Sequence, residues 1–203
     1  MMYFISRAIY EFILRFFCGF EILGRENLPS SGPYITVSNH ISYSDPVIVG
    51  IACGWVRVTF MAKKELFERP LFGKYVKSLG VIPVERHSGS PEPLKKCVGL
   101  LKKGKIVGLF PEGTRSIDGN LLEPELGVGL VAAKTGAPIV PFYVTGSDKL
   151  LKRDRRTITP TKVKVRIGKP VDIRESLKIA DKKKSYEDVS RKVMAAIAQL
   201  KDE

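Results

Sequence analysis

The 203-residue sequence predicts an α/β fold, in which a central, mostly parallel sheet is flanked by helices and preceded by an N-terminal amphipathic helix. The composition, 44% hydrophobic and 27% charged, is that of a folded globular protein. After a predicted turn at residues 28–33, short runs rich in Val, Ile, Phe and Tyr alternate with stretches of helical spacing. We therefore expect residues 1–23 to form the helix and residues 24–203 to form one α/β domain with a basic C-terminal part.

Residues 1–20 combine three charges with many aromatic side chains. Arg7, Glu11 and Arg15 follow at i, i+4 and i+8, which places them on one helical stripe where Glu11 can pair with both arginines. The other faces are apolar, but the charges interrupt them too often for a membrane span, and no signal-peptide cleavage site follows. We expect a helix that lies at a membrane surface. Packing against the domain core is the alternative, and one helix can do both.

Six runs have the enrichment in β-branched and aromatic residues that buried strands require. The predicted strands are residues 34–37, 57–62, 80–84, 106–110, 138–144 and 162–167. Five segments between and after them have helical spacing of apolar residues, namely residues 45–53, 64–79, 93–103, 128–135 and 186–200. In such a fold the functional loops lie at the ends of the strands.

The net charge of +13 predicts attraction to a polyanion, which can be nucleic acid, anionic lipid or a phosphorylated substrate. Residues 147–203 carry 17 Lys and Arg against 9 Asp and Glu, so +8 of this charge lies there. Its basic runs are either a solvated surface or a face for an anionic membrane. Three widely spaced cysteines indicate neither a disulfide framework nor a zinc site and fit a reducing cytoplasm. Two histidines without a cysteine cluster indicate no metal.

His40 lies directly after a predicted strand, and Asp45 follows it by five residues. An imidazole titrates near neutrality, and a neighbouring carboxylate can fix its tautomer and stabilise the imidazolium. This spacing arises by chance about one time in twenty, so the pair alone also fits a histidine that merely caps a turn. No nucleophile stands in a G-x-S-x-G elbow. If the pair is catalytic, the proton therefore comes from a substrate hydroxyl, without a covalent acyl-enzyme.

A second motif, Phe110-Pro111-Glu112-Gly113-Thr114-Arg115-Ser116, follows an apolar run and so lies at the carboxyl edge of a strand. Gly113 permits close backbone approach, Thr114 offers a hydroxyl, and Arg115 has a planar fork suited to phosphate. A third stretch, residues 80–86, ends in Arg86, which can reach the same anion. Taken singly, each arginine is more often part of a surface ion pair.

Four blocks occur in this order: N-H-x-x-x-x-D, G-x-I-x-x-x-R, F-P-E-G-T-R-S and the apolar Ile139-Val140-Pro141. Together they resemble the glycerolipid acyltransferase family, whose best-known members are the 1-acyl-glycerol-3-phosphate acyltransferases. The resemblance covers residues 24–146. It implies that His40 is the general base and that Asp45 orients it. It also implies that the phosphate of the substrate is bound by Arg86, Glu112, Gly113, Thr114 and Arg115. The acyl site is then lined by Val140 and Pro141.

The resemblance implies an enzyme of phospholipid biosynthesis that moves a fatty acyl group from acyl-CoA or acyl carrier protein to the sn-2 hydroxyl of 1-acyl-glycerol-3-phosphate. The thioester is a co-substrate, and no cofactor or metal is expected. The expected location is the cytoplasmic face of a membrane. One departure is Glu125, since many relatives carry a basic residue two places before the glycine aligned with Gly127; Lys63 and Lys64 can supply positive charge instead.

Two alternatives stay open. The acceptor can be another lysophospholipid or an amino-acid-derived lipid, because such relatives share the four blocks. Alternatively, the chain is a non-catalytic module that binds anionic lipid or nucleic acid through its basic C-terminal part, although this leaves His40 and Asp45 unexplained. The expected partners are the lysophospholipid, the acyl donor and an anionic membrane surface, with no specific nucleic acid.

Overall fold

A computed structural model describes residues 2–85, 90–150 and 159–202. Its main sheet has the strand order β1-β8-β7-β2-β6-β3, and all neighbours are parallel except the antiparallel pair β7 and β8. This confirms the predicted mostly parallel sheet. The strands are β1 (Glu21–Leu23), β2 (Ile35–Ser38), β3 (Val58–Thr59), β6 (Ile106–Leu109), β7 (Ile139–Thr145) and β8 (Lys164–Ile167); β4 (Met61–Lys63) and β5 (Ile82–Val84) form a second, parallel pair.

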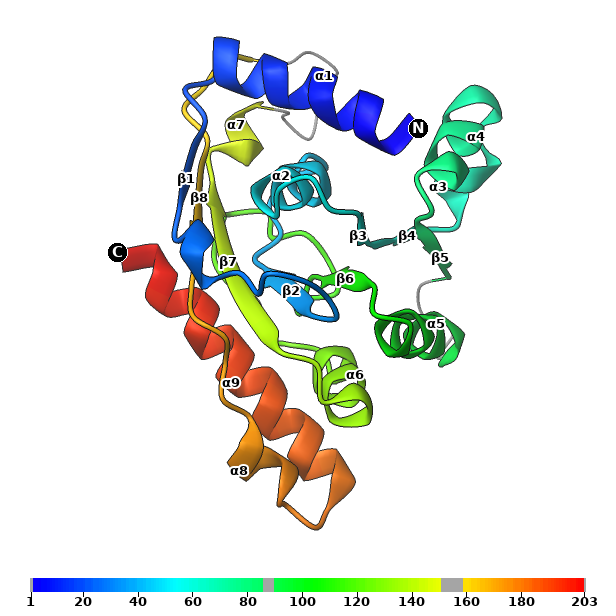
Figure 1. Cartoon of the computed structure of the whole chain (residues 1–203), viewed down its shortest axis with the longest axis vertical. Coiled ribbons are helices and arrows are strands. Elements are labelled where there is room, and N and C mark those ends of the chain that lie inside the picture. Colours follow the sequence, from blue (N-terminus) through cyan, green and yellow to red (C-terminus); the bar gives the residue numbers. More distant parts are fainter. Residues whose placement is uncertain (1, 86–89, 151–158, 203) are drawn as a thin grey trace.

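Helices cover both faces of the main sheet (Figure 1). On one face lie α1 (Met2–Phe17) and α2 (Asp45–Ala52), and on the other α5 (Glu92–Lys102), α6 (Gly127–Thr135) and α9 (Lys182–Asp202). The shorter elements are the 3₁₀ turn η1 (Arg25–Asn27), α3 (Glu65–Glu68), α4 (Pro70–Ser78), α7 (Ser147–Leu150) and α8 (Arg174–Leu177). The five long helical segments that the spacing predicted are all present, apart from the one divided into α3 and α4.

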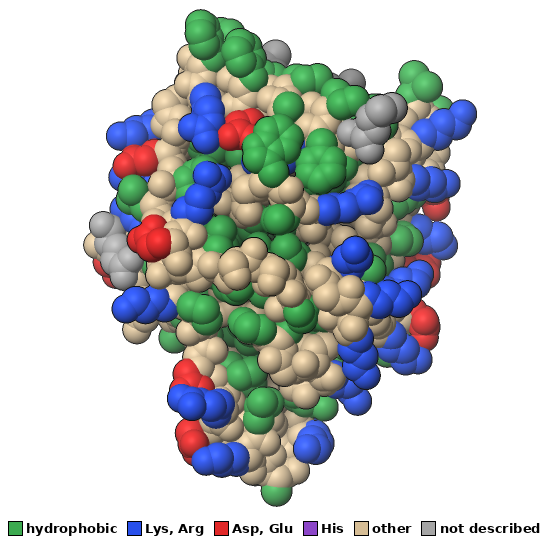
Figure 2. All heavy atoms as spheres, viewed as in Figure 1, with side chains coloured by type: hydrophobic (Ala, Val, Ile, Leu, Met, Phe, Trp, Pro, Cys, Tyr) green, Lys and Arg blue, Asp and Glu red, His purple; other side chains and the backbone are tan. Residues whose placement is uncertain are grey.

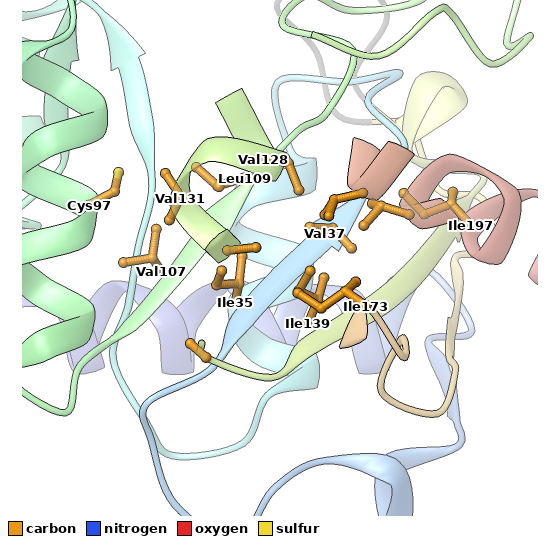
Figure 3. Close-up of a cluster of buried hydrophobic side chains, with 14 of the residues drawn as sticks. Ile35, Val37, Cys97, Val107, Leu109, Val128, Val131, Ile139, Ile173 and Ile197 are labelled. Atoms are coloured by element: carbon orange, nitrogen blue, oxygen red, sulfur yellow. The ribbon is translucent and has the colours of Figure 1, made fainter. Parts of the chain in front are cut away.

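Alternation along the strands divides the buried side chains into two clusters, one on each face of the sheet. Ile35 and Val37 of β2 and Ile139 of β7 point toward α6 and α9 (Figure 3). On β7 the intervening Val140 and Phe142 belong to the opposite cluster, which includes buried residues of α1 and α2. Both faces of β2 and β7 are therefore buried, which explains their largely apolar sequences.

Two elements that were predicted as continuous are each divided into two in the structure. The predicted strand 57–62 divides at Phe60, so that β3 pairs with β6 and β4 pairs with β5. The buried Phe60 ring packs where a side chain at Gly108 would stand, which places Phe60 between the two sheets. The predicted helix 64–79 is broken at Arg69, whose ψ of 131° is extended. The cause is Pro70, because a proline disfavours the helical conformation in the residue before it.

α1 turns its charged stripe partly inward. Arg7 is buried against α2, where its guanidinium donates to the Ile51 carbonyl (3.2 Å). Glu11 pairs with Arg7 at 3.1 Å and with Arg15 at 2.9 Å, which confirms the predicted double pairing. The exposed large apolar side chains of α1 are Met2, Phe4, Ile5, Ile9, Phe12, Phe16 and Phe17. Figure 2 shows hydrophobic side chains gathered over α1 at the upper edge of the molecule.

The boundary expected after residue 23 comes directly after β1 in the chain. This strand is too short to be recognised in the sequence. β1 pairs with β8, so part of the segment 1–23 belongs to the main sheet. The division of the chain at this point stays a prediction.

Candidate active site

His40 and Asp45 lie together at the carboxyl end of β2, where the chain leaves the sheet and enters α2. Nδ1 of His40 and Oδ2 of Asp45 are 2.8 Å apart. The same oxygen accepts the backbone N–H groups of Ile41 and Ser42, both at 2.7 Å. Asp45 is completely buried, whereas 15% of the imidazole is exposed. A neutral imidazole bonded in this way carries its proton on Nδ1, which leaves Nε2 able to accept a proton from a substrate.

Two further contacts fix the imidazole and the strand end from which it projects. The ring of Phe110 stacks on the ring of His40, with centroids 4.0 Å apart and planes 17° apart. The side chain of Asn39 extends the pairing of β2 with β7, since it donates to the Val144 carbonyl at 2.9 Å and accepts the Val144 N–H at 2.7 Å. The imidazole thus has a defined position, as a general base requires.

Glu112 holds the loop that follows β6 against the backbone of His40. Its Oε1 accepts the His40 N–H at 2.9 Å, and its Oε2 accepts the Leu122 N–H at 3.1 Å. From the same loop, the Ser116 N–H donates to the His40 carbonyl at 2.8 Å. Burial raises the pKa of the Glu112 carboxyl above its ordinary value, although the two N–H groups act in the opposite direction. Glu112 therefore joins the two motifs; its part in phosphate binding stays a prediction.

The predicted phosphate residues Gly113, Thr114 and Arg115 lie in this loop beside His40. Gly113 has a φ of +64°, a conformation that favours glycine, and both Gly113 and Thr114 are exposed. The guanidinium of Arg115 lies 3.6 Å from the centroid of the Tyr43 ring, in the loop between His40 and Asp45. The structure therefore brings the first and third motifs together. Arg86 lies outside the described residues.

Val140 and Pro141 lie within β7, opposite Thr36 and Val37 of β2. Both are buried by the protein's own side chains, and Val140 packs in the cluster under α2. They belong to the sheet and not to the loops that carry His40 and Arg115. Their lining of an acyl site stays a prediction.

Three residues of the site carried no role in the sequence analysis. Tyr43 and Phe110 stood inside recognised motifs, so aromatic side chains next to the candidate groups were the available signal. Ser147 lies 102 positions from Asp45 and donates its hydroxyl to Oδ1 of that residue at 2.6 Å. Ser147 stands three residues after the predicted strand 138–144, and this position was its only signal in the sequence. Within the described segments, no three His, Cys, Asp or Glu side chains are grouped to hold a metal.

A family model matches the segment that contains His40, Asp45 and the loop of Arg115. Residues 19–145, more than half of the chain, match the family model described as Acyltransferase. The chain belongs to the acyltransferase family. The resemblance inferred from the four motifs is thus confirmed.

Relatives of this acyltransferase include the chloroplastic 1-acyl-sn-glycerol-3-phosphate acyltransferase BAT2 of Brassica napus, 39% identical over 155 residues. That match covers 74% of this chain and 44% of the relative, and a match to LPAT1 of Arabidopsis thaliana covers 43% of that relative. The chain thus spans less than half the length of these plant relatives. A 1-acyl-sn-glycerol-3-phosphate acyltransferase of Bacillus subtilis is 31% identical over 153 residues, which are 75% of this chain and 74% of the relative.

A solved structure shows the same fold. The 1-acyl-sn-glycerophosphate (LPA) acyltransferase PlsC from Thermotoga maritima superposes with a TM-score of 0.75 and is 27% identical. The match covers 99% of this chain and 80% of that one. It confirms the predicted α/β class, with a mostly parallel sheet between helices.

Proposed function

We propose that this acyltransferase transfers a fatty acyl group from a thioester to the sn-2 hydroxyl of 1-acyl-glycerol-3-phosphate and so forms phosphatidic acid. The observation that carries the proposal is the pairing of His40 with buried Asp45 beside the loop of Arg115. The names of the Brassica, Arabidopsis, Bacillus and Thermotoga relatives support the same acceptor.

In the proposed reaction, Nε2 of His40 removes the proton of the acceptor hydroxyl while that oxygen attacks the thioester carbonyl. The resulting tetrahedral intermediate collapses with cleavage of the C–S bond. The thiolate leaves and takes the proton from His40, so the enzyme returns to its starting state with one ester and one thiol formed. Asp45 holds Nδ1 and stabilises the imidazolium between these steps. Acyl-CoA and acyl carrier protein are both suitable donors.

The proposed phosphate site is the loop at residues 113–115, with Arg115 as its cation. Because Arg115 stacks on Tyr43, its guanidinium is held next to the loop of the general base. A phosphate bound there would place the glycerol hydroxyls near His40. The proposed phosphate site thus raises the rate by orienting the glycerol hydroxyls toward His40, and not by the strength of binding alone.

We further propose that α1 lies in the surface of an anionic membrane, on its cytoplasmic face. Seven exposed apolar residues on one helix are typical of a helix at the headgroup boundary. None of the helices in the described residues is long and apolar enough to cross a bilayer. Tyr10 of α1 donates to the hydroxyl of Ser44 at 2.7 Å, so the helix also rests on the loop of the active site. A lipid acceptor would then reach His40 without leaving the membrane surface.

The decisive experiment is an assay of thiol release from acyl-CoA and from acyl carrier protein, with and without lysophosphatidic acid. We expect release that depends on the acceptor. His40→Ala should lower kcat by a factor on the order of a hundred to ten thousand, because the general base is lost. Ser185→Ala, which removes a buried hydroxyl in α9, is the control for folding. Near-native turnover by His40→Ala would refute the mechanism.

Arg115→Ala should raise the KM for lysophosphatidic acid and leave the KM for the acyl donor unchanged, because it removes the proposed phosphate ligand. The matched control is Arg191→Ala, an exposed arginine on α9. A change in the KM of the donor alone would mean that this loop binds the thioester carrier.

One observation favours a second acceptor class. The side chain of Glu125 lies against the Gly113 turn, with its Cγ 3.0 Å from the place of a Cβ at Gly113. A carboxylate at this point disfavours a dianionic phosphate monoester and favours an acceptor that also carries a cation. A panel of lysophospholipids, including amine-bearing headgroups, distinguishes the two acceptors by their kcat/KM.

A further inference from the structure

A buried hydroxyl from a distant part of the chain contacts the carboxylate of the catalytic pair. Oγ of Ser147 is 2.6 Å from Oδ1 of Asp45, and both residues are completely buried. The contact joins the end of β7 to the start of α2. It lies on the side of Asp45 away from the imidazole, because His40 bonds to the other oxygen.

The hydrogen bonds of Asp45 are divided unequally between its two oxygens. Oδ2 accepts three, from Nδ1 of His40 and from the N–H groups of Ile41 and Ser42. Oδ1 accepts the hydroxyl of Ser147. A buried carboxylate oxygen without a donor is costly, so without this hydroxyl the carboxylate would turn toward other donors or admit water. Either movement would disturb Oδ2 and with it the imidazole.

The backbone turn at the end of β7 places the side chain of Ser147 next to Asp45. Gly146 adopts a φ of +80°, and a Cβ there would lie 2.1 Å from the Lys162 carbonyl oxygen. Only glycine fits this turn, which ends the strand and places Ser147 at the first position of α7. The hydroxyl is therefore held by the fold and not by a flexible surface loop.

We propose that Ser147 is a positioning residue of the active site, which holds Oδ1 of Asp45 so that Oδ2 keeps Nδ1 of His40 in place. A serine hydroxyl suits this task because it donates a hydrogen bond without adding a charge that would compete with the imidazolium. The inference rests on the proposed function for its kinetic consequences. Its structural part concerns His40 and Asp45 alone.

The kinetic test compares Ser147→Ala, Ser147→Cys and Ser147→Thr. Alanine removes the donor, cysteine keeps a similar shape with a weak donor, and threonine keeps the hydroxyl. We expect kcat to fall by about tenfold to a hundredfold for alanine and cysteine, as for a lost hydrogen bond to a charged group, and to recover largely for threonine. The KM for the acceptor should stay within about twofold of the wild-type value, since the phosphate loop is unchanged. Ser185→Ala, another buried hydroxyl with a hydrogen bond, should leave kcat unchanged.

A second measurement tests the hydrogen bond between His40 and Asp45 directly and does not require catalytic turnover. In protein labelled with ¹⁵N-histidine, the Nδ1 proton of His40 should give a downfield signal, assigned by its absence in His40→Ala. We expect the signal to broaden or vanish in Ser147→Ala and Ser147→Cys and to persist in Ser147→Thr and Ser185→Ala. An unchanged signal in both the alanine and cysteine variants would overturn the proposal, as would native kcat in both. Absence of acyl transfer in the wild type would refute the proposed function, while the signal would still decide the role of Ser147.

Discussion

Tyr43 and Arg115 show how one side chain can set the position of another in this site. The guanidinium of Arg115 lies over the ring of Tyr43, a residue that is 56% exposed. A cation over an aromatic face gains about 0.5–1 kcal/mol at an exposed site. The stacking also restricts the long arginine side chain to fewer rotamers. If Arg115 binds the phosphate of the acceptor as proposed, Tyr43 contributes to that binding without touching the reacting atoms.

We predict that Tyr43→Ala raises the KM for lysophosphatidic acid about two- to fivefold, which corresponds to the loss of a cation–π contact. Tyr43→Phe should behave as the wild type, because the contact uses the ring face and not the hydroxyl. Initial-rate kinetics with varied acceptor measure both. A loss of activity in Tyr43→Phe equal to that in Tyr43→Ala would show that the hydroxyl, and not the ring, is used.

At the scale of elements, α1 combines two surfaces of opposite character. Its inner side carries Arg7 and Tyr10, which bind the end and the beginning of α2. Trp55, just after α2, covers the guanidinium of Arg7 at 4.2 Å. The outer side is apolar. A helix whose polar groups face the protein and whose apolar groups face outward is suited to an apolar medium and not to water.

We predict that Phe12→Glu combined with Phe16→Glu abolishes sedimentation with anionic vesicles. These side chains are 62% and 72% exposed, so the fold does not need them, but a charge there opposes insertion. Activity on acceptor dispersed in detergent should be retained. The control is Leu177→Glu combined with Ala180→Glu, which adds the same charge at exposed positions around α8. Undiminished vesicle binding by the Phe12 and Phe16 variant would remove the membrane role from α1.

At the scale of the whole molecule, stability depends on how closely the helix layers approach each other. α6 packs on α9 through Gly129, where an added Cβ would lie 2.1 Å from the carbonyl oxygen of Tyr186. The backbones are in direct contact here, so a larger residue requires the two helices to separate. At Gly99 of α5 the space is open, with no atom within 4 Å of an added Cβ.

We predict that Gly129→Ala lowers the free energy of unfolding by at least about 1–3 kcal/mol, as expected for overpacking. Gly99→Ala should raise it by about 0.5–1 kcal/mol, since alanine favours a helix more than glycine does. Urea denaturation of both variants measures the difference. Equal effects of the two substitutions would mean that α6 and α9 separate at little cost.

The architecture was largely predictable from local patterns. Five of the six predicted strands and four of the five predicted helices appear as single elements, because apolar periodicity reports directly which faces are buried. The helix predicted over residues 64–79 was wrong because Pro70 disfavours the helical conformation at Arg69, an effect that the spacing of apolar residues does not report. The strand predicted over residues 57–62 was wrong because its two halves pair with different strands, β3 with β6 and β4 with β5. Such pairing between distant segments cannot be read from local composition.

The sequence by itself determined the α/β class, the family and the spacing of His40 and Asp45, because these depend on residues that are neighbours in the chain. Only the tertiary structure decided that Glu112 binds the backbone of His40, that Arg115 stacks on Tyr43, and that Ser147 holds Asp45. Each of these contacts joins residues 72 or 102 positions apart, and each depends on the direction of side chains at a shared edge of the sheet. Parallel strands carry their loops to one edge, and their order in the sheet, which no local pattern specifies, decides which loops meet.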